Sequence, residues 1–282
     1  MPKTLLITGS SRGLGRALAE AALAAGHRVL ATARTPDALR DLTERYPGTA
    51  RAAALDVTDP DAAEAAVKTA VRAFGRLDAV LNNAGYSQVG AIEDTSLEDF
   101  RAQLETNLWG AVHVSKAALP VLRAQRGGHL VQISSLSGRL APVAGLGAYV
   151  TAKFALEGFS EALALEAGGF GVKVTIVEPG SIATTLSSGM VRTPPSAPYT
   201  EVVAPLMNRY ADPAAGHGTS PRRAAEVLLK LLDLPEPPLW LPLGGDALDH
   251  VRAAERRKLA ELDRWAGLSR EPDEKAAGEV AR

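Results

Sequence analysis

Short apolar runs alternate with longer amphipathic runs through most of this chain, and no other feature limits the possible folds as strongly. The apolar runs predict strands at residues 5–8, 29–33, 53–56, 79–82, 130–134, 172–177 and 239–243. Helical patterns cover residues 14–25, 36–46, 60–74, 148–167 and 221–232, and residues 97–126 carry either one long helix or two abutting helices. Strands that alternate with helices form a parallel sheet, and right-handed crossovers place helices on both of its faces. The predicted fold is therefore α/β, a Rossmann-type doubly wound parallel sheet of about seven strands.

Two of the predicted helices are preceded by capping residues. Asp59 stands before Pro60, and Thr35 stands before Pro36. A short polar side chain just before a helix accepts hydrogen bonds from its free N–H groups, and proline is tolerated in the first turn. We expect both Asp59 and Thr35 to be N-caps.

The composition excludes several classes of protein. The net charge is −1, which gives no reason to expect a nucleic-acid partner. No run approaches the ~20 apolar residues of a membrane span, and we expect a cytoplasmic protein. The chain has no cysteine, so disulfides, a catalytic thiol and thiolate metal sites are excluded, and we expect no metal site.

A glycine-rich turn follows the first predicted strand and reads Thr-Gly-Ser-Ser-Arg-Gly-Leu-Gly at residues 8–15. Glycine permits a tight turn and close approach of the backbone to a pyrophosphate. A helix that starts near Gly13 directs free N–H groups and its positive dipole end toward such an anion. The turn therefore predicts a dinucleotide site at Gly9, Ser11, Arg12, Gly13, Leu14 and Gly15. The alternative is a strand–helix turn without a ligand, because the spacing differs from the common Gly-x-Gly-x-x-Gly.

The end of the second predicted strand bears on the cofactor. Domains that bind NAD usually carry an acidic residue about 20 positions further on, which bonds the ribose 2′-hydroxyl. Here the strand ends in Ala33-Arg34, without a carboxylate. Arg34 and Arg12 could flank a 2′-phosphate through charge-assisted hydrogen bonds, which favours NADP(H). The alternative is two exposed arginines.

Tyr149 and Lys153 are four residues apart at the start of a predicted helix, so they share one face. A free tyrosine has a pKa of about 10, too high for a good base near neutrality. A nearby ammonium favours the phenolate, and the pair could therefore act as a general acid and base. Taken alone, the pair could equally be two helix-surface residues.

These motifs occur in the order known from one family: the turn at residues 8–15, Asn82-Asn83-Ala84-Gly85, Asn107, the serines near Ser135, Tyr149 with Lys153, and Pro179-Gly180. In that order they resemble the short-chain dehydrogenase/reductase family in its compact single-domain branch, over residues 3–245. Residues 147–166 resemble the part of this branch that contains hydroxysteroid and retinol dehydrogenases. The resemblance implies an NADP(H)-binding oxidoreductase domain at residues 1–250, with a substrate loop at 185–220. A C-terminal helical extension and tail would occupy residues 251–282, where Leu248, Val251, Leu259 and Leu262 fit one helix face.

The resemblance also implies roles for single residues. Tyr149 would be the catalytic acid and base, and Lys153 would bind the nicotinamide ribose and depress the pKa of Tyr149. Ser135 would hydrogen-bond the substrate oxygen, and Asn107 would kink its helix and hold a water that links Lys153 to solvent. Further cofactor contacts are implied with the adenine (Asp56, Val57), the adenine-side ribose (Asn83, Ala84, Gly85) and the nicotinamide carboxamide (Ile182 and Thr184, after Pro179 and Gly180). Each has an alternative without a ligand: Ser135 could be an ordinary strand-end serine, Asn107 a residue of a helix interior, and Asp56 a loop cap. Residues 82–85 could be a turn, and Pro179-Gly180 could only terminate a strand.

The serine assignment has two candidates. Ser135 stands fourteen positions before Tyr149, and in the family this interval is usually one residue shorter. Either the loop between Gly138 and Gly147 contains one additional residue, or the active serine is shifted. The pattern of adjacent serines favours Ser135, and Ser137 is the alternative.

The implied reaction interconverts a carbonyl and a primary or secondary alcohol. The substrate is expected to be mainly apolar, because the 185–220 segment contains apolar residues and Tyr86, Val89, Leu140 and Val143 could line a pocket with it. One alternative is a non-catalytic NADP(H)-binding sensor or scaffold, and another is an epimerase or dehydratase on a related scaffold. Relatives commonly form homodimers or homotetramers by pairing their long central helices.

Overall fold

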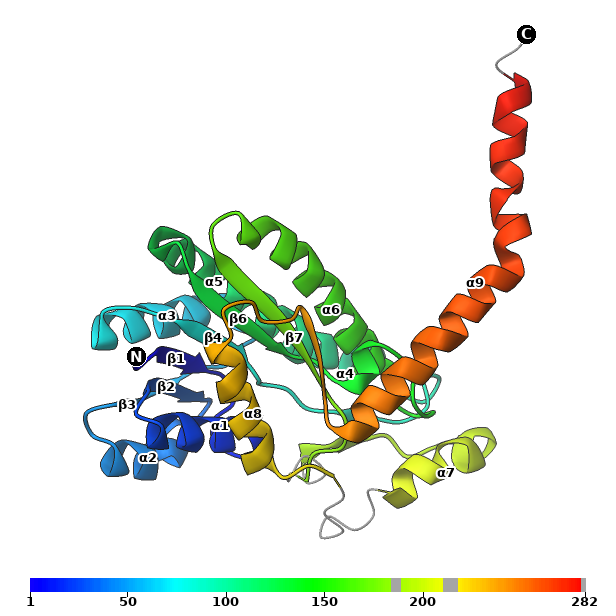
Figure 1. Ribbon diagram of the computed structural model, residues 1–282. Coiled ribbons are helices and arrows are strands. Elements are labelled where there is room, and N and C mark those ends of the chain that lie inside the picture. Colours follow the sequence, from blue (N-terminus) through cyan, green and yellow to red (C-terminus); the bar gives the residue numbers. More distant parts are fainter. Residues whose placement is uncertain (184–188, 210–217, 280–282) are drawn as a thin grey trace.

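The computed structural model describes residues 1–183, 189–209 and 218–279. Its centre is one parallel sheet of seven strands in the order β3-β2-β1-β4-β6-β7-β9 (Figure 1). The strands are β1 (Thr4–Ile7), β2 (Arg28–Ala33), β3 (Ala50–Ala54), β4 (Ala79–Asn82), β6 (Gly128–Ile133), β7 (Val172–Pro179) and β9 (Trp240–Leu243). The predicted doubly wound α/β sheet is confirmed.

Helices cover both faces of this sheet (Figure 1). One face carries α1 (Gly13–Ala24), α2 (Arg40–Arg45) and α8 (Pro221–Asp233), and the other carries α3 (Pro60–Phe74), α5 (Gly110–Gln125) and α6 (Gly147–Gly168). Successive strand residues point to opposite faces of the sheet. Leu5 and Ile7 therefore join the core beneath α1, α2 and α8, while Leu6 joins the core beneath α3, α5 and α6. Because both faces are buried, the strands read as nearly continuous apolar runs.

The strand order reverses at β1, and this reversal positions the site. The chain leaves β1 toward β2 on one side and later returns to β4 on the other side. The loops that follow these two strands therefore diverge, which opens a crevice outside the carboxyl ends of the strands.

The 97–126 segment is continuous but not uniform. It consists of α4 (Leu97–Leu104), a π-helical turn (Glu105–Trp109) and α5. Asn107 lies in the π-helical turn and is buried. Such single wide turns inside α-helices are frequent at functional sites.

Some local predictions were wrong. The helix expected at 36–46 begins as a 3-10 turn (Pro36–Leu39) before α2, and the Thr35 side chain makes no capping hydrogen bond. Leu39 of the 3-10 turn and Leu42 of α2 are both buried. β3 begins at Ala50 rather than residue 53, because the whole Ala50–Ala54 segment pairs with β2 and alanine gives little strand signal.

The 185–220 segment is more regular, in its described part, than its sequence suggests. β8 (Val191–Arg192) pairs in parallel with β5 (Gln88–Val89), and a helix follows, α7 (Thr200–Arg209). Val203 and Leu206 of α7 are buried. The segment is therefore attached to the domain by backbone pairing and by apolar packing.

The last helix, α9 (Gly245–Glu279), packs on the domain only at its beginning, and its later part extends outward (Figure 1). Ala247, Val251 and Ala254 are buried. Of the four apolar residues expected to form one face, only Val251 is buried, whereas Leu248, Leu259 and Leu262 are exposed. Among the described helices, none is both long and apolar enough to cross a bilayer.

The N-cap of α3 gives a stability prediction. Asp59 Oδ1 accepts hydrogen bonds from the backbone N–H groups of Asp61 (2.8 Å) and Ala62 (3.2 Å), which confirms the predicted cap. Asp59→Ala should lower the free energy of unfolding by about 1 kcal/mol in urea denaturation, because these donors lose their acceptor. Asp59→Asn should retain most of the stability, since its side-chain oxygen can accept the same bonds. Equal losses in both variants would contradict the capping role.

Candidate active site

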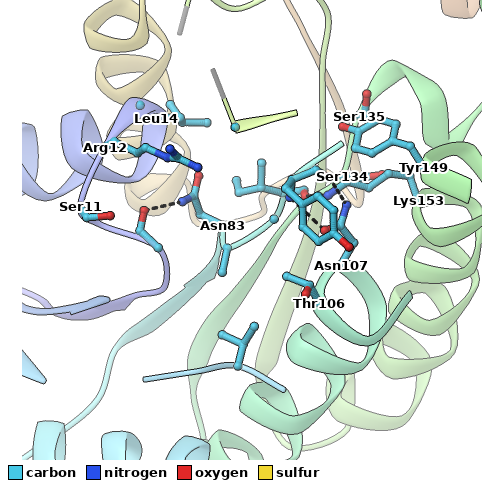
Figure 2. Close-up of a pocket in the computed structure, with 18 of the residues that line it drawn as sticks. Ser11, Arg12, Leu14, Asn83, Thr106, Asn107, Ser134, Ser135, Tyr149 and Lys153 are labelled. Atoms are coloured by element: carbon cyan, nitrogen blue, oxygen red, sulfur yellow. Dashed lines mark hydrogen bonds between the residues drawn. The ribbon is translucent and has the colours of Figure 1, made fainter. Parts of the chain in front are cut away.

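A cleft of about 740 Å³ opens at the carboxyl edge of the sheet. Figure 2 shows Ser11 and Arg12 at one side of it, and Ser135, Tyr149 and Lys153 at the other. Most of the residues expected from the sequence line this cleft: Gly9, Ser11, Arg12, Gly13, Leu14, Arg34, Asp56, Val57, Asn83, Ala84, Gly85, Asn107, Ser135, Tyr149, Lys153, Pro179, Gly180 and Ile182. Gly15 does not line it, and Thr184 lies outside the described residues.

The glycine-rich turn is built for close backbone approach. Gly9 and Gly13 adopt positive φ angles of 67° and 58°, which favour glycine. A Cβ on Gly15 would stand 2.3 Å from both the Gly9 carbonyl oxygen and Asn83 Nδ2, so no larger residue fits there. The first turn of α1 contains no acidic residue, and Arg12 at its N-cap makes no side-chain capping bond. This helix end therefore fits the pyrophosphate of a dinucleotide.

The floor of the cleft is tied to the first strand. Thr8 Oγ1 accepts hydrogen bonds from the backbone N–H groups of Asn83 and Ala84, both at 2.9 Å. Asn83 Nδ2 donates to the Thr8 carbonyl oxygen at 2.9 Å. These bonds pair backbone groups at the point where β1 and β4 separate, and they fix the floor against the glycine-rich turn.

The two arginines come from different loops. Arg34 follows β2 and is exposed. The backbone and hydroxyl of Thr58 hydrogen-bond Asp56 and lower the pKa of its carboxyl group, and the nearby charge of Arg34 lowers it further. Arg12 reaches from the glycine-rich turn to Gly189, where an added Cβ would lie 2.5 Å from an Arg12 guanidinium nitrogen. Both arginines therefore provide positive charge along the cleft.

α6 positions the candidate acid–base pair, Tyr149 and Lys153. Lys153 Nζ donates to the Ile133 carbonyl oxygen at 2.7 Å and lies 5.8 Å from the centroid of the Tyr149 ring. Burial lowers the pKa of Lys153 to about 8, and the Glu157 carboxyl opposes this shift. The strand end and the helix thus hold the ammonium beside the phenol.

The structure separates the two candidate serines. Ser135 lines the cleft, whereas Ser137 is buried and does not line it. The backbone N–H of Ser137 donates to Ser135 Oγ at 3.1 Å, within a 3-10 turn (Leu136–Gly138). This bond orients the Ser135 hydroxyl.

The Asn107 side chain binds the backbone of Tyr86. Its Nδ2 donates to the Tyr86 carbonyl oxygen at 2.9 Å, and its Oδ1 accepts from the Tyr86 N–H at 3.1 Å. Both polar ends of the side chain are therefore engaged.

Several residues of the cleft were not expected from the sequence: Ala33, Leu55, Thr58, Thr106, Ile133 and Ser134. Gly189 and Val191, which also line it, come from the segment expected to form the substrate loop. Ala33 and Ile133 end strands β2 and β6, so their place at the carboxyl edge was a usable signal. Of the four residues expected to form an apolar pocket, Tyr86 lines the cleft. Val89 is buried in a separate cluster with Leu146 and Leu206, while Leu140 and Val143 do not line the cleft.

Comparisons with known proteins agree with this geometry. A family model described as short chain dehydrogenase matches residues 3–194. "Oxidoreductase BOA17" of Botryotinia fuckeliana is 45% identical over 273 residues, which cover 95% of this chain and 98% of the relative. The crystal structure of a short-chain dehydrogenase from Streptomyces avermitilis superposes with a TM-score of 0.88 at 40% identity, covering 96% of this chain and 98% of that one.

A further solved structure, "ElxO with NADP Bound", has a TM-score of 0.73 at 25% identity and covers 88% of this chain and 100% of that one. The family match spans well over half of the sequence, and the first two relatives match nearly its whole length. The cleft between the glycine-rich turn and the Tyr149–Lys153 pair is the expected place for a nicotinamide cofactor. The chain therefore belongs to the short-chain dehydrogenase family and is an oxidoreductase of that type.

Proposed function

We propose that the protein interconverts a carbonyl compound and the corresponding alcohol, with NADP(H) as its cofactor and Tyr149 as its acid and base. The observation that carries this proposal is the meeting of Ser135, Tyr149 and Lys153 in one cleft with the glycine-rich turn. When bound, the nicotinamide supplies or accepts the hydride.

The side chains divide the remaining work. Ser135 holds the substrate oxygen and stabilises the charge that develops on it. Tyr149 donates a proton to that oxygen during reduction and removes it during oxidation. The Lys153 ammonium favours the phenolate through its charge and contacts the ribose hydroxyls. Asn107 holds Tyr86, which lines the same cleft, in place.

The cofactor preference rests on Arg12 and Arg34. Both line the cleft, and β2 ends in Ala33-Arg34, without a carboxylate for the ribose 2′-hydroxyl at the strand end. A 2′-phosphate would gain charge-assisted hydrogen bonds from these guanidinium groups that NAD(H) lacks. Solved structures of similar fold hold either NADP, as in ElxO, or NAD, as in a short chain dehydrogenase/reductase from Burkholderia phymatum, so the proposed preference rests on the arginines. Further cofactor contacts are proposed with the adenine, the adenine-side ribose and the nicotinamide carboxamide. The residues proposed for them all line the cleft: Asp56, Val57, Asn83, Ala84, Gly85 and Ile182.

The substrate is proposed to be mainly apolar. Tyr86, Ile182 and Val191 line the cleft. Tyr149, Met190 and Met207 pack against one apolar cluster, and both methionines come from the segment after Gly189. A medium-sized apolar ketone, aldehyde or alcohol fits this lining.

Assembly is proposed to use the long central helices. Phe154 and Leu165 of α6 are exposed, as are Trp109 before α5 and Phe170 after α6. Apolar surface of this kind is typical of an interface between subunits, in a homodimer or homotetramer.

The role of Tyr149 can be tested by removing one hydroxyl. With a panel of apolar ketones and aldehydes, Tyr149→Phe should lower kcat by about 10²–10⁴-fold, because no group at that position can transfer the proton. NADPH affinity, measured by fluorescence, should stay within about twofold of the wild type, a difference well below 1 kcal/mol. Tyr46→Phe is the matched control, because Tyr46 lies outside the cleft. Turnover that survives in Tyr149→Phe would exclude the acid–base role.

The cofactor preference can be tested by titrating NADPH and NADH separately. Arg34→Ala should weaken NADPH binding by about 10–100-fold, the loss of one charge-assisted hydrogen bond, and should leave NADH binding nearly unchanged. Arg45→Ala removes the same charge from an exposed site outside the cleft and serves as the control. Equal wild-type affinities for NADPH and NADH would show that the arginines do not select the cofactor.

The two serines can be distinguished by single substitutions. Ser135→Ala should lower kcat by about 10²–10³-fold, the usual effect of removing a donor to a developing oxyanion. Ser137→Ala should change kcat only a few-fold, because Ser137 does not line the cleft. The reverse order of effects would assign the active serine to Ser137.

A further inference from the structure

A third residue of α6 shares the face that carries the acid–base pair. Tyr149, Lys153 and Glu157 follow one another at intervals of four residues. Lys153 holds the Ile133 carbonyl, and Glu157 Oε1 accepts a 2.7 Å hydrogen bond from Ser134 Oγ. Side chains of α6 therefore hydrogen-bond two consecutive residues, Ile133 and Ser134, at the end of β6 and immediately before Ser135. Glu157 is 4% exposed, so this carboxyl group lies inside the protein.

A second carboxyl group faces Glu157. Glu178 of β7 is fully buried, and neither of its oxygens has a hydrogen-bond donor within the described residues. Burial raises the pKa of Glu157 to about 8 and also raises the pKa of Glu178. Two adjacent buried carboxyl groups cannot both ionise easily, so the pair retains a proton near neutral pH.

Arg139 compensates the remaining negative charge. Its Nη1 lies 3.5 Å from Glu178 Oε1, and its Nη2 lies 3.4 Å from Glu255 Oε1 on α9. Lys258, one turn further along α9, donates to the Arg139 carbonyl oxygen at 2.9 Å. The guanidinium also stacks over Trp240 at 5.5 Å. α9 thus holds both the backbone and the side chain of Arg139.

The beginning of α9 holds the loop on the other side of the site. Asp246 Oδ2 accepts a 2.9 Å hydrogen bond from the Ser181 N–H. A Cβ on Gly180 would lie 2.5 Å from the Asp246 carboxyl oxygens, which shows how closely the two segments pack. Gly180 and Ile182 line the cleft. One helix therefore contacts both the loop that contains Ser135 and the loop that follows Pro179.

We propose that Glu157, Glu178 and Arg139 form a positioning cluster that fixes the end of β6 around Ser135, and that α9 holds this cluster in place. The catalytic part of this inference rests on the proposed function. Lys153, Glu157 and Glu161 of α6, Glu178 of β7, Arg139, and Glu255 of α9 are the charged groups that act on the pair. While the pair holds its proton, the single negative charge is matched by Arg139. When that proton leaves, a second negative charge appears beside Ser134.

The retained proton predicts how stability depends on pH. The folded pair keeps protons that the unfolded chain releases above a pKa of about 4.5, so wild-type stability should fall as pH rises toward about 8. Glu178→Gln preserves the shape but leaves Glu157 without a second carboxyl group beside it, so Glu157 can take the single negative charge and the folded variant retains less of the proton. The Tm of Glu178→Gln minus that of the wild type should therefore increase between pH 5 and pH 8, by about 2–4 °C per pH unit. Burial of Lys153 acts in the opposite sense and above this window.

Glu166→Gln is the matched control for this measurement, because Glu166 is an exposed glutamate on the same helix and is not among the charged groups that act on the pair. Its Tm difference from the wild type should stay flat across the same pH range. If Glu178→Gln and Glu166→Gln give parallel curves, the buried pair does not hold a proton and the proposal is overturned. This measurement uses no substrate, so it is independent of the proposed function.

The role of α9 is tested by Glu255→Gln against Glu261→Gln, an exposed site further along α9 that contacts Trp265 rather than Arg139. Loss of the Glu255 ion pair should speed hydrogen exchange of residues 135–146 about two- to fivefold in Glu255→Gln only. The kcat should fall by a similar factor, with NADPH affinity unchanged. Unchanged exchange in Glu255→Gln would overturn the proposal, as would faster exchange with unchanged kcat. If the wild type reduces no carbonyl compound, the proposed function fails while the exchange result still decides whether α9 positions the loop.

Discussion

The separation of β1 and β4 at their carboxyl ends is the constraint on which the site depends. Neighbouring parallel strands satisfy each other's backbone groups only while they run together, and here their loops diverge. Thr8 resolves this, because its hydroxyl oxygen accepts the N–H groups of Asn83 and Ala84. α1 also packs closely against the ends of these strands, so there is no room for a Cβ at Gly15. A crevice with free helix N–H groups follows from these two requirements.

The spacing of side chains along α6 places the candidate catalytic residues against the end of β6. Residues four apart on α6 lie on one face, and β6 ends against that face, so Lys153 and Glu157 reach Ile133 and Ser134 in turn. These side-chain contacts hold the strand end and the helix in one register. The position of the Ser135 hydroxyl relative to Tyr149 is thus set by buried bonds rather than by the loop alone.

The sequence predicted the sheet, most helices and the placement of the catalytic candidates, because apolar periodicity and strand ends are local signals. β5 and β8 could not be predicted, because a two-residue strand is too short to show a period. α7 could not be predicted, because Pro205 interrupts its helical pattern. Thr35 occupies the N-cap position of the 3-10 turn, but its side chain makes no capping hydrogen bond, which the residue type alone does not reveal. The contacts of Glu178 with Glu157 and Arg139 join segments far apart in the chain, and no local sequence pattern predicts such contacts.

A buried pair of acids is unfavourable unless something compensates it, and removing one partner of such a group leaves an uncompensated charge. In this chain the compensation comes from Arg139, and Arg139 is in turn held by Glu255 and Lys258 of the last helix. The order of these contacts runs from α9 inward to Ser134, the residue before Ser135. The outer part of α9 extends into solvent, but its first turns hold Arg139 beside the buried acids. The charge balance beneath the cleft therefore depends on the beginning of this helix.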